Sequence, residues 1–182
     1  GQDAYRGFVA RLVERADAQA RAFPATHRFV IAPMPNPDGV DNGNWRSNQG
    51  GVDLNRDWRD LTQPETRALT RWILRETEGR RVVAMMDFHS TDRTVMYAPP
   101  LDAPSPTVDW LNTLKATFDA TLGEDVPWTY SHSATGGTSK TWALETLKAP
   151  GVTVELWDHS PIGASRALGA ATADAMIAHF TR

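Results

Sequence analysis

The sequence of 182 residues contains no cysteine. This absence excludes disulfide bonds and Cys-ligated zinc or iron–sulfur sites, so any metal site must be built from histidines and carboxylates. It leaves the cellular compartment open, because a cysteine-free chain suits oxidising and reducing environments alike.

Long apolar runs and an excess of charge of one sign are also missing. No apolar run approaches the roughly 18–20 residues that span a membrane, so we expect no membrane partner. The formal net charge is only −3 and the arginines are scattered, which gives no electrostatic basis for binding nucleic acid.

The remaining composition is that of an ordinary globular domain. Hydrophobic residues make up 41% of the chain and charged residues 23%, both typical values, and a chain of this length fits one domain, residues 1–182. A capping-box pattern at Thr62-Gln-Pro-Glu65 and a helix-start signal at Ser160-Pro161 add to the apolar periodicity. The predicted helices cover 3–22, 62–78, 107–122 and 160–180, and the predicted strands cover 28–34, 81–88 and 151–157. This alternation predicts an α/β fold, a three-layer sandwich with a mixed, largely parallel central sheet.

His89 stands where the apolar strand predicted at 81–88 runs into polar residues. In open α/β sheets, ligand-binding and catalytic residues usually lie at the carboxyl ends of the strands. The two-residue period of a strand places Asp87 and His89 on one face. His89 is therefore either a strand-end histidine bonded to a neighbour or a metal ligand, since neutral imidazole is the commonest metal ligand.

Glu155 interrupts the otherwise apolar strand predicted at 151–157. An unpaired buried carboxylate costs several kcal/mol, so it needs a reason to be there. One reading is a salt bridge to an arginine. The other is a general base whose pKa is raised by its dry surroundings.

A loop rich in Gly, Asn and Asp carries Arg46, Asn55 and Arg56. Taken alone, each of these side chains is expected to be a solvated surface residue. Together they suit a carboxylate, because charge-assisted hydrogen bonds from planar donors contribute about 1.5–3 kcal/mol each. The loop is therefore a candidate carboxylate-binding pocket.

Several stretches occur together in an order that resembles a known family. The chain is similar to the central and C-terminal parts of zinc carboxypeptidases of the carboxypeptidase A superfamily. The matching stretches are "PMPNPDGV", "WR" at Trp45-Arg46, "GVDLNRDW", "DFHST", "SATGG" and "TVELWD".

The resemblance implies a role for each of the singled-out residues. His89 would be a ligand of one catalytic Zn²⁺, and Glu155 the general base that activates water. Asn55 and Arg56 would bind the free C-terminal carboxylate of a peptide substrate. Arg46 would polarise the scissile carbonyl and stabilise the oxyanion.

The family's first two zinc ligands come from a His-x-x-Glu motif, which this sequence does not contain: none of its five histidines is followed by Glu three residues later. The resemblance places that motif just before Gly1. We therefore expect the chain to lack the N-terminal portion of the domain and to be inactive alone. Asp92 and His159 are conceivable but weak substitutes as ligands.

Two further positions depart from the family. His132 stands where the family has a mobile tyrosine, and Tyr130 lies two residues away, so either could contact substrate. Ser139 occupies the position of the side-chain pocket floor, next to Lys140. These two residues predict a preference for small, polar or acidic C-terminal residues.

Three functions remain open from the sequence. The first is a metallocarboxypeptidase acting on peptides, and the second is an amide hydrolase acting on acylated amino acids. The third is a zinc-free module that binds a carboxylate or a peptide terminus without catalysis. A sheet edge left uncovered in a partial domain also predicts pairing with a second copy, and therefore a homodimer.

Overall fold

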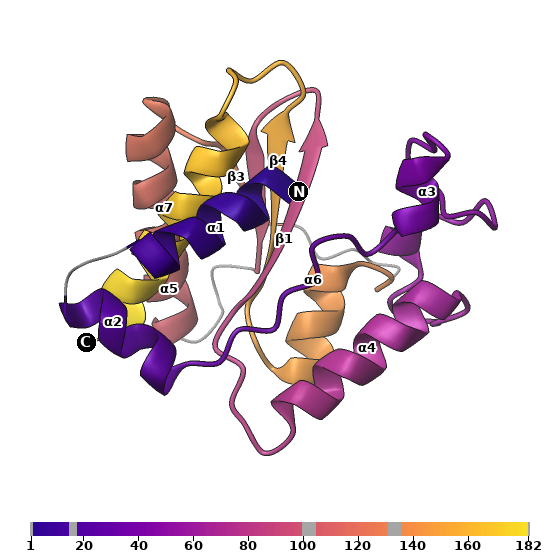
Figure 1. Cartoon of the computed structure of the whole chain (residues 1–182), viewed down its shortest axis with the longest axis horizontal. Coiled ribbons are helices and arrows are strands. Elements are labelled where there is room, and N and C mark those ends of the chain that lie inside the picture. The colour runs from indigo at the N-terminus through magenta and orange to yellow at the C-terminus, as the bar shows by residue number, and fades with distance from the viewer. Residues whose placement is uncertain (1, 15–17, 100–104, 131–135, 182) are drawn as a thin grey trace.

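The computed structural model describes residues 2–14, 18–99, 105–130 and 136–181. Helices and strands alternate along the chain, as Figure 1 shows. The elements are α1 (Gln2–Glu14), α2 (Ala18–Thr26), α3 (Pro37–Asp41), the 3-10 turn η1 (Leu54–Arg56), α4 (Pro64–Thr77), β1 (Met85–Thr91), β2 (Val95–Ala98), α5 (Ser105–Leu122), β3 (Trp128–Tyr130), α6 (Ser139–Trp142), the π-helical turn η2 (Ala143–Leu147), β4 (Gly151–Trp157) and α7 (Ala164–Phe180).

The described strands form one mixed sheet in the order β1-β4-β2-β3. β1 and β4 run parallel, with Met85 opposite Gly151 and Thr91 opposite Trp157. β2 runs antiparallel to β4 and parallel to β3. Parallel pairing therefore prevails, and the predicted mixed, largely parallel sheet is confirmed.

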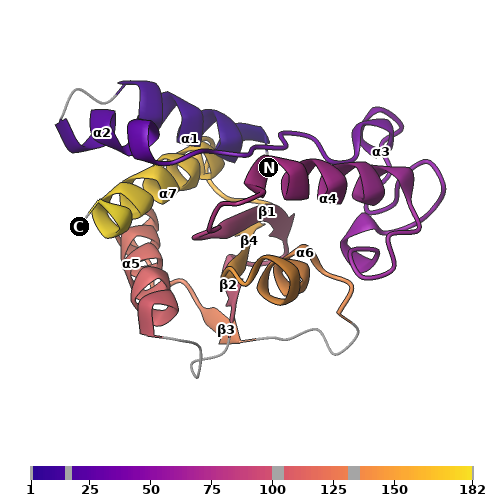
Figure 2. The same ribbon diagram turned by 90° about the horizontal axis from the view of Figure 1, so that it is seen from below.

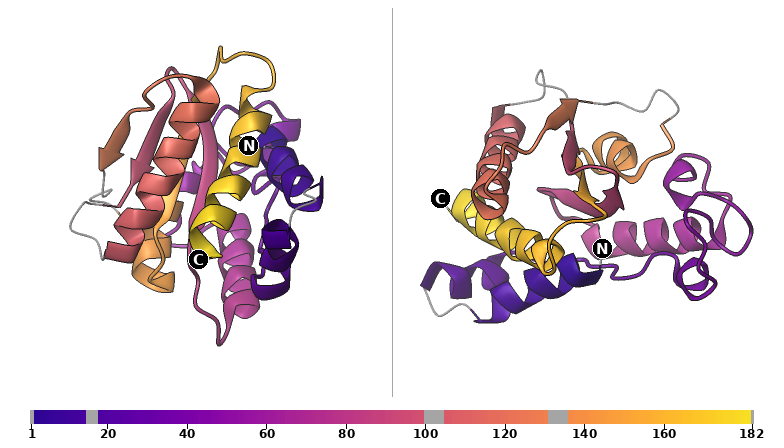
Figure 3. Two further views of the ribbon diagram at one scale, coloured as in Figure 1. Left: turned by 90° about the vertical axis from the view of Figure 1, so that its left-hand side faces the viewer. Right: turned by 90° about the horizontal axis from the view of Figure 1, so that it is seen from above.

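Helices cover both faces of the sheet, which confirms the predicted α/β fold. α5 and α7 pack on one face, and α6 lies on the other with α4 beyond it (Figure 2). α1 packs along the outer side of α7 (Figure 3). Because β4 is covered on both faces, its first four residues are buried. Val152 and Val154 belong to a core that includes Trp110 and Phe118 of α5.

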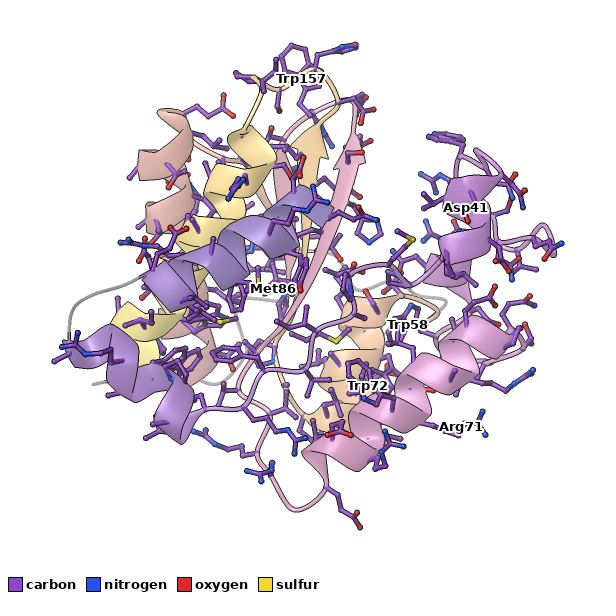
Figure 4. All side chains as sticks on the ribbon, in the orientation of Figure 1. Asp41, Trp58, Arg71, Trp72, Met86 and Trp157 are labelled. Carbon is purple, nitrogen blue, oxygen red and sulfur yellow. The ribbon has the colours of Figure 1, made fainter. Side chains whose placement is uncertain are left out.

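On the face of the sheet that α6 covers, aromatic packing and one carboxylate hold α4 and α6 in place. Trp58 lies between α4 and α6 (Figure 4), and its ring centroid is 5.3 Å from that of Trp142. Asp57, next to it, accepts hydrogen bonds from Thr62 and Thr66 at the start of α4. This carboxylate replaces the predicted capping box, because the hydroxyl of Thr62 donates to Asp57 and Gln63 takes the N-cap position without a side-chain bond.

Segment 28–34 is not a strand, which corrects the sequence prediction. Phe29 packs on helices instead of in the sheet: its ring lies edge-on to Phe8 of α1 and Phe23 of α2. These contacts partly bury Phe29 without any ladder of hydrogen bonds.

Three predicted boundaries are also corrected. The helix expected over 3–22 is two helices, α1 and α2, with residues 15–17 outside the described part. The strand expected over 81–88 is shifted to Met85–Thr91, because only those residues pair with β4. The last helix begins at Ala164, after a left-handed Gly163. No described helix has the length and apolar character needed to cross a membrane.

Candidate active site at the carboxyl ends of β1 and β4

His89 and Glu155 meet at the carboxyl ends of two adjacent strands. They are register partners in the parallel β1–β4 pair, and opposite residues in such a pair project to the same face. Both side chains are partly buried. Trp157, labelled in Figure 4, marks this end of β4, where the strand passes into a loop.

Asp87 holds the ring of His89, as the shared strand face predicts. The Nε2 atom of His89 lies 2.8 Å from Oδ2 of Asp87. Burial lowers the pKa of His89, but the carboxylates of Asp87 and Glu155 outweigh burial and raise it above its ordinary value. Burial raises the pKa of Asp87, but the charge and hydrogen bond of His89 bring it below its ordinary value. The Nδ1 atom is the end of the ring that points away from this bond.

Glu155 has the electrostatics of a general base. Burial raises the pKa of its carboxyl above the ordinary value, and the charge of His89 partly offsets this. Its Oε2 atom is buried and has no hydrogen-bond partner among the described residues. A carboxylate oxygen without a partner in a half-buried site is placed to bind water or substrate.

Arg46 approaches the site from the loop after α3. Its guanidinium lowers the pKa of Glu155, which shows that the two charges are within electrostatic reach. Arg46 also lies over the ring of Trp45, 5.0 Å from its centroid, and its Nη1 is 3.4 Å from Oδ2 of Asp53. The other oxygen of Asp53 accepts from the backbone of Asn55 at 2.9 Å. Asp53 therefore connects Arg46 to the Asn55-Arg56 pair, a link that the sequence analysis missed.

Asn55 is fixed by the start of α6. Its Oδ1 accepts a hydrogen bond of 3.0 Å from the backbone N–H of Ser139, so the amide nitrogen is the end left to donate. The following Arg56 is exposed, and its Nη1 donates to the carbonyl of Asn55 at 2.8 Å. A Cβ on Gly137 would lie 2.3 Å from the carbonyl oxygen of Arg56, so only glycine allows this close contact.

Ser139 and Lys140 lie on the Asn55-Arg56 side of the site. Ser139 is 1% exposed, and its hydroxyl donates to Oδ2 of Asp87. Burial and the charge of Arg56 lower the pKa of Lys140, which places this ammonium group near the guanidinium. The predicted preference for small, polar or acidic C-terminal residues stays a prediction.

The structure does not bring Tyr130 to His89 and Glu155. It lies on β3, at the far edge of the sheet from β1. Its ring packs 5.2 Å from that of Trp128. His132, the other expected substrate contact, lies outside the described residues.

A zinc site is built only in part by the described residues. No cluster of three or more His, Cys, Asp or Glu side chains able to hold a metal occurs among them, whereas a catalytic zinc takes three protein ligands. His89 does fit one such ligand, because ligating histidines usually bond a carboxylate through their other ring nitrogen. The orphaned oxygen of Glu155 fits a base beside the ion.

Comparison with known sequences places this chain among peptidases. The sequence profile of the zinc carboxypeptidase family matches residues 1–163. Cytosolic carboxypeptidase 1 of Danio rerio is 38% identical over 81 residues, which cover 41% of this chain and 7% of that protein.

Two solved structures with the same fold are about twice as long as this chain. A metallo-carboxypeptidase from Burkholderia cenocepacia superposes with a TM-score of 0.77 at 20% identity, over 98% of this chain and 52% of that chain. A metallo-carboxypeptidase from Pseudomonas aeruginosa, in complex with (2-guanidinoethylmercapto)succinic acid, gives a TM-score of 0.76 at 18% identity, over 97% and 52%. Because the family profile matches most of this chain, residues 1–163, the chain belongs to the zinc carboxypeptidase family.

Proposed function

We propose that this chain carries the substrate-binding and proton-transfer part of a zinc-dependent metallocarboxypeptidase that removes the C-terminal residue of peptides. The observation that carries the proposal is the pairing of His89 with Glu155 across β1 and β4, with Asp87 bonded to the histidine. The family match supports it. The loop that bears Arg46, Asn55 and Arg56 lies against the same site.

In this mechanism the loop recognises the end of a peptide. The amide nitrogen of Asn55 and the guanidinium of Arg56 bind the free carboxylate, and charge-assisted bonds of this kind give both affinity and orientation. Arg46 lies within electrostatic reach of Glu155. It provides positive charge where the carbonyl oxygen becomes negative, usually the largest electrostatic contribution in such reactions.

Glu155 accepts the proton of the attacking water and passes it to the leaving amine. Its partial burial keeps its basicity above that of an exposed glutamate, which suits proton transfer near neutral pH. A bound Zn²⁺ supplies Lewis-acid chemistry, lowering the pKa of water and polarising the carbonyl.

His89 would hold the ion through the ring nitrogen that faces away from Asp87. Two further ligands are needed, and the resemblance assigns them to a His-x-x-Glu motif, which this sequence does not contain. Figures 1 and 2 show the first turn of α1 beside β1.

The proposal is tested by zinc content and peptide hydrolysis in a purified polypeptide that joins this chain to a His-x-x-Glu segment, because this chain alone is expected to be inactive. Native mass spectrometry should show one zinc, and peptides with a free C-terminus should lose their last residue. Glu155→Gln should lower kcat by roughly 10²–10⁴-fold, the usual contribution of a general base. The control Glu145→Gln changes an exposed glutamate of η2 and should leave kcat unchanged.

Other outcomes would select one of the alternative functions. Cleavage of acylated amino acids with no action on peptides would assign an amide hydrolase. Binding of peptides with a free C-terminus, without zinc and without turnover, would assign a binding module.

A further inference from the structure

Ser139 touches two parts of the candidate site that come from distant segments. Its backbone N–H donates to the side chain of Asn55, 84 positions earlier, at 3.0 Å. Its hydroxyl donates to the side chain of Asp87, 52 positions earlier. Among the described residues, Ser139 alone is hydrogen-bonded both to β1 and to the loop that bears Arg46, Asn55 and Arg56, called here the carboxylate-binding loop.

The hydroxyl of Ser139 and the ring of His89 bond the same carboxylate oxygen. Oδ2 of Asp87 accepts from Oγ of Ser139 and lies 2.8 Å from Nε2 of His89. Two donors from different directions restrict the rotation of the carboxylate. The ring of His89 is therefore fixed through Asp87 by a residue that does not touch it.

The backbone of Ser139 also decides which end of the Asn55 amide faces outward. A backbone N–H can only donate, so the atom that it meets must be the amide oxygen. The amide nitrogen of Asn55 then points away from α6 and is the end that can donate to a carboxylate.

We infer that Ser139 is a positioning residue that holds the Asp87–His89 pair and the Asn55 amide in one fixed arrangement. The purpose of this arrangement is to hold a zinc ligand and a substrate-binding amide in place, so the inference rests on the proposed function. It differs from the pocket floor that the resemblance assigns to Ser139, because the side chain is 1% exposed and its hydroxyl already donates to a carboxylate.

The first test is zinc affinity, measured by competition with a chelator in a polypeptide that joins this chain to a His-x-x-Glu segment. Ser139→Ala removes the hydroxyl and leaves the backbone bond to Asn55. It should weaken zinc binding 10–100-fold, as is typical when a supporting partner of a metal ligand is lost. Ser139→Thr keeps a hydroxyl and should recover most of the affinity.

A matched control exists on the same helix. Thr141→Ala removes a buried hydroxyl whose partner is the hydroxyl of Thr138, at 2.9 Å, and not Asp87. It should leave zinc affinity unchanged. An equal loss of affinity in Thr141→Ala and Ser139→Ala would overturn the inference, because it would show a general loss of packing. If Ser139→Ala does not fold, Ser139→Cys carries the same test with a weak donor of similar size.

The second test needs no metal. Long-range ¹H–¹⁵N NMR spectra of the metal-free protein report which ring nitrogen of His89 carries the proton. The wild type should show the proton on Nε2, and Ser139→Ala should show a mixture of the two tautomers. Identical spectra for the two proteins would overturn the inference.

The two readouts separate this inference from the proposed function. A changed tautomer in a protein that binds no zinc would support the positioning role and count against the metallocarboxypeptidase. Normal zinc affinity and tautomer in Ser139→Ala, with an altered preference among C-terminal residues, would show that Ser139 is a pocket floor and not a positioning residue.

Discussion

At the scale of single residues, Arg46 is a proposed catalytic side chain that few contacts hold in place. Its side chain is 55% exposed, and among the described residues its ion pair is with Asp53. An exposed pair of this kind contributes about 0–1 kcal/mol to stability. We therefore expect the ion pair between Arg46 and Asp53 to matter for geometry, because it keeps the guanidinium of Arg46 on the side of Glu155.

Asp53→Asn is expected to impair catalysis much more than stability. The substitution removes the charge that attracts Arg46 but keeps a side-chain oxygen for the backbone N–H of Asn55. We expect kcat/KM to fall roughly ten- to hundredfold, because small displacements of a catalytic group have large kinetic effects. The free energy of unfolding should change by no more than about 1 kcal/mol.

Peptide hydrolysis and urea denaturation of the same preparations measure both quantities. Asp41→Asn is the matched control, since Asp41 is an exposed carboxylate of α3 (Figure 4). A fall in stability that matches the fall in activity would show that Asp53 maintains the fold of the loop instead.

At the scale of elements, the strands that carry the site were predictable and the short ones were not. The apolar runs at 81–88 and 151–157 indicate buried strands, and β4 has the predicted bounds. β2 and β3, with four and three residues, are too short to show a period. Segment 28–34 has the composition of a strand, but it forms none, and its Phe29 packs on α1 and α2.

The same limit applies to the site. The shared face of Asp87 and His89 follows from the period of one strand, and the bond between them is observed. The bonds from Ser139 to Asn55 and Asp87 join residues far apart in sequence, and no local pattern encodes them. The roles of Arg46, Asn55 and Arg56 came from a family resemblance, which composition and spacing alone could not supply.

Asp57 provides a test of how the carboxylate-binding loop is attached to α4. The side chain is 4% exposed and accepts from the backbone N–H groups of Thr62 and Gln63 and from the hydroxyls of Thr62 and Thr66. Burial raises the pKa of Asp57, but these bonds outweigh burial and bring the pKa below its ordinary value of 3.8. The folded state therefore binds the proton less readily than the unfolded state.

The sign of the pH dependence follows from this lowered pKa. Asp57 stabilises the fold fully above the unfolded pKa of 3.8, and this contribution is lost as the pH falls through the lower folded pKa. Asp57→Asn should lower the free energy of unfolding by about 2–4 kcal/mol at neutral pH, because an amide cannot accept all of these bonds. The difference between the two proteins should shrink below about pH 4.

Denaturation followed by tryptophan fluorescence, at several values between about pH 7 and pH 3, measures this difference. Asp60→Asn, a change at an exposed carboxylate in the same turn, should have little effect on stability. A difference that stays constant with pH would contradict the prediction, since it would show that the charge of Asp57 contributes nothing.

At the scale of the whole molecule, the described sheet has one long edge. β1 and β3 are its outer strands, and β1 is the longer, with seven residues. An uncovered edge strand offers unpaired N–H and C=O groups to another chain. A second copy of the chain offers a strand that can pair with this edge.

We predict that a protein of this sequence alone pairs through β1 into a homodimer. Pairing satisfies the backbone groups on the outer side of β1 and shields its partly buried apolar residues, which favours association at high concentration. Sedimentation velocity over a wide range of concentration should show a shift from monomer to dimer. Ser90→Lys places a charge on the exposed face of the edge strand and should move the equilibrium towards monomer, as lysines on natural edges do. Ser90→Thr keeps the strand neutral and should leave the equilibrium unchanged. A monomer at the highest concentration, or a dimer that Ser90→Lys does not weaken, would show that β1 is not the interface.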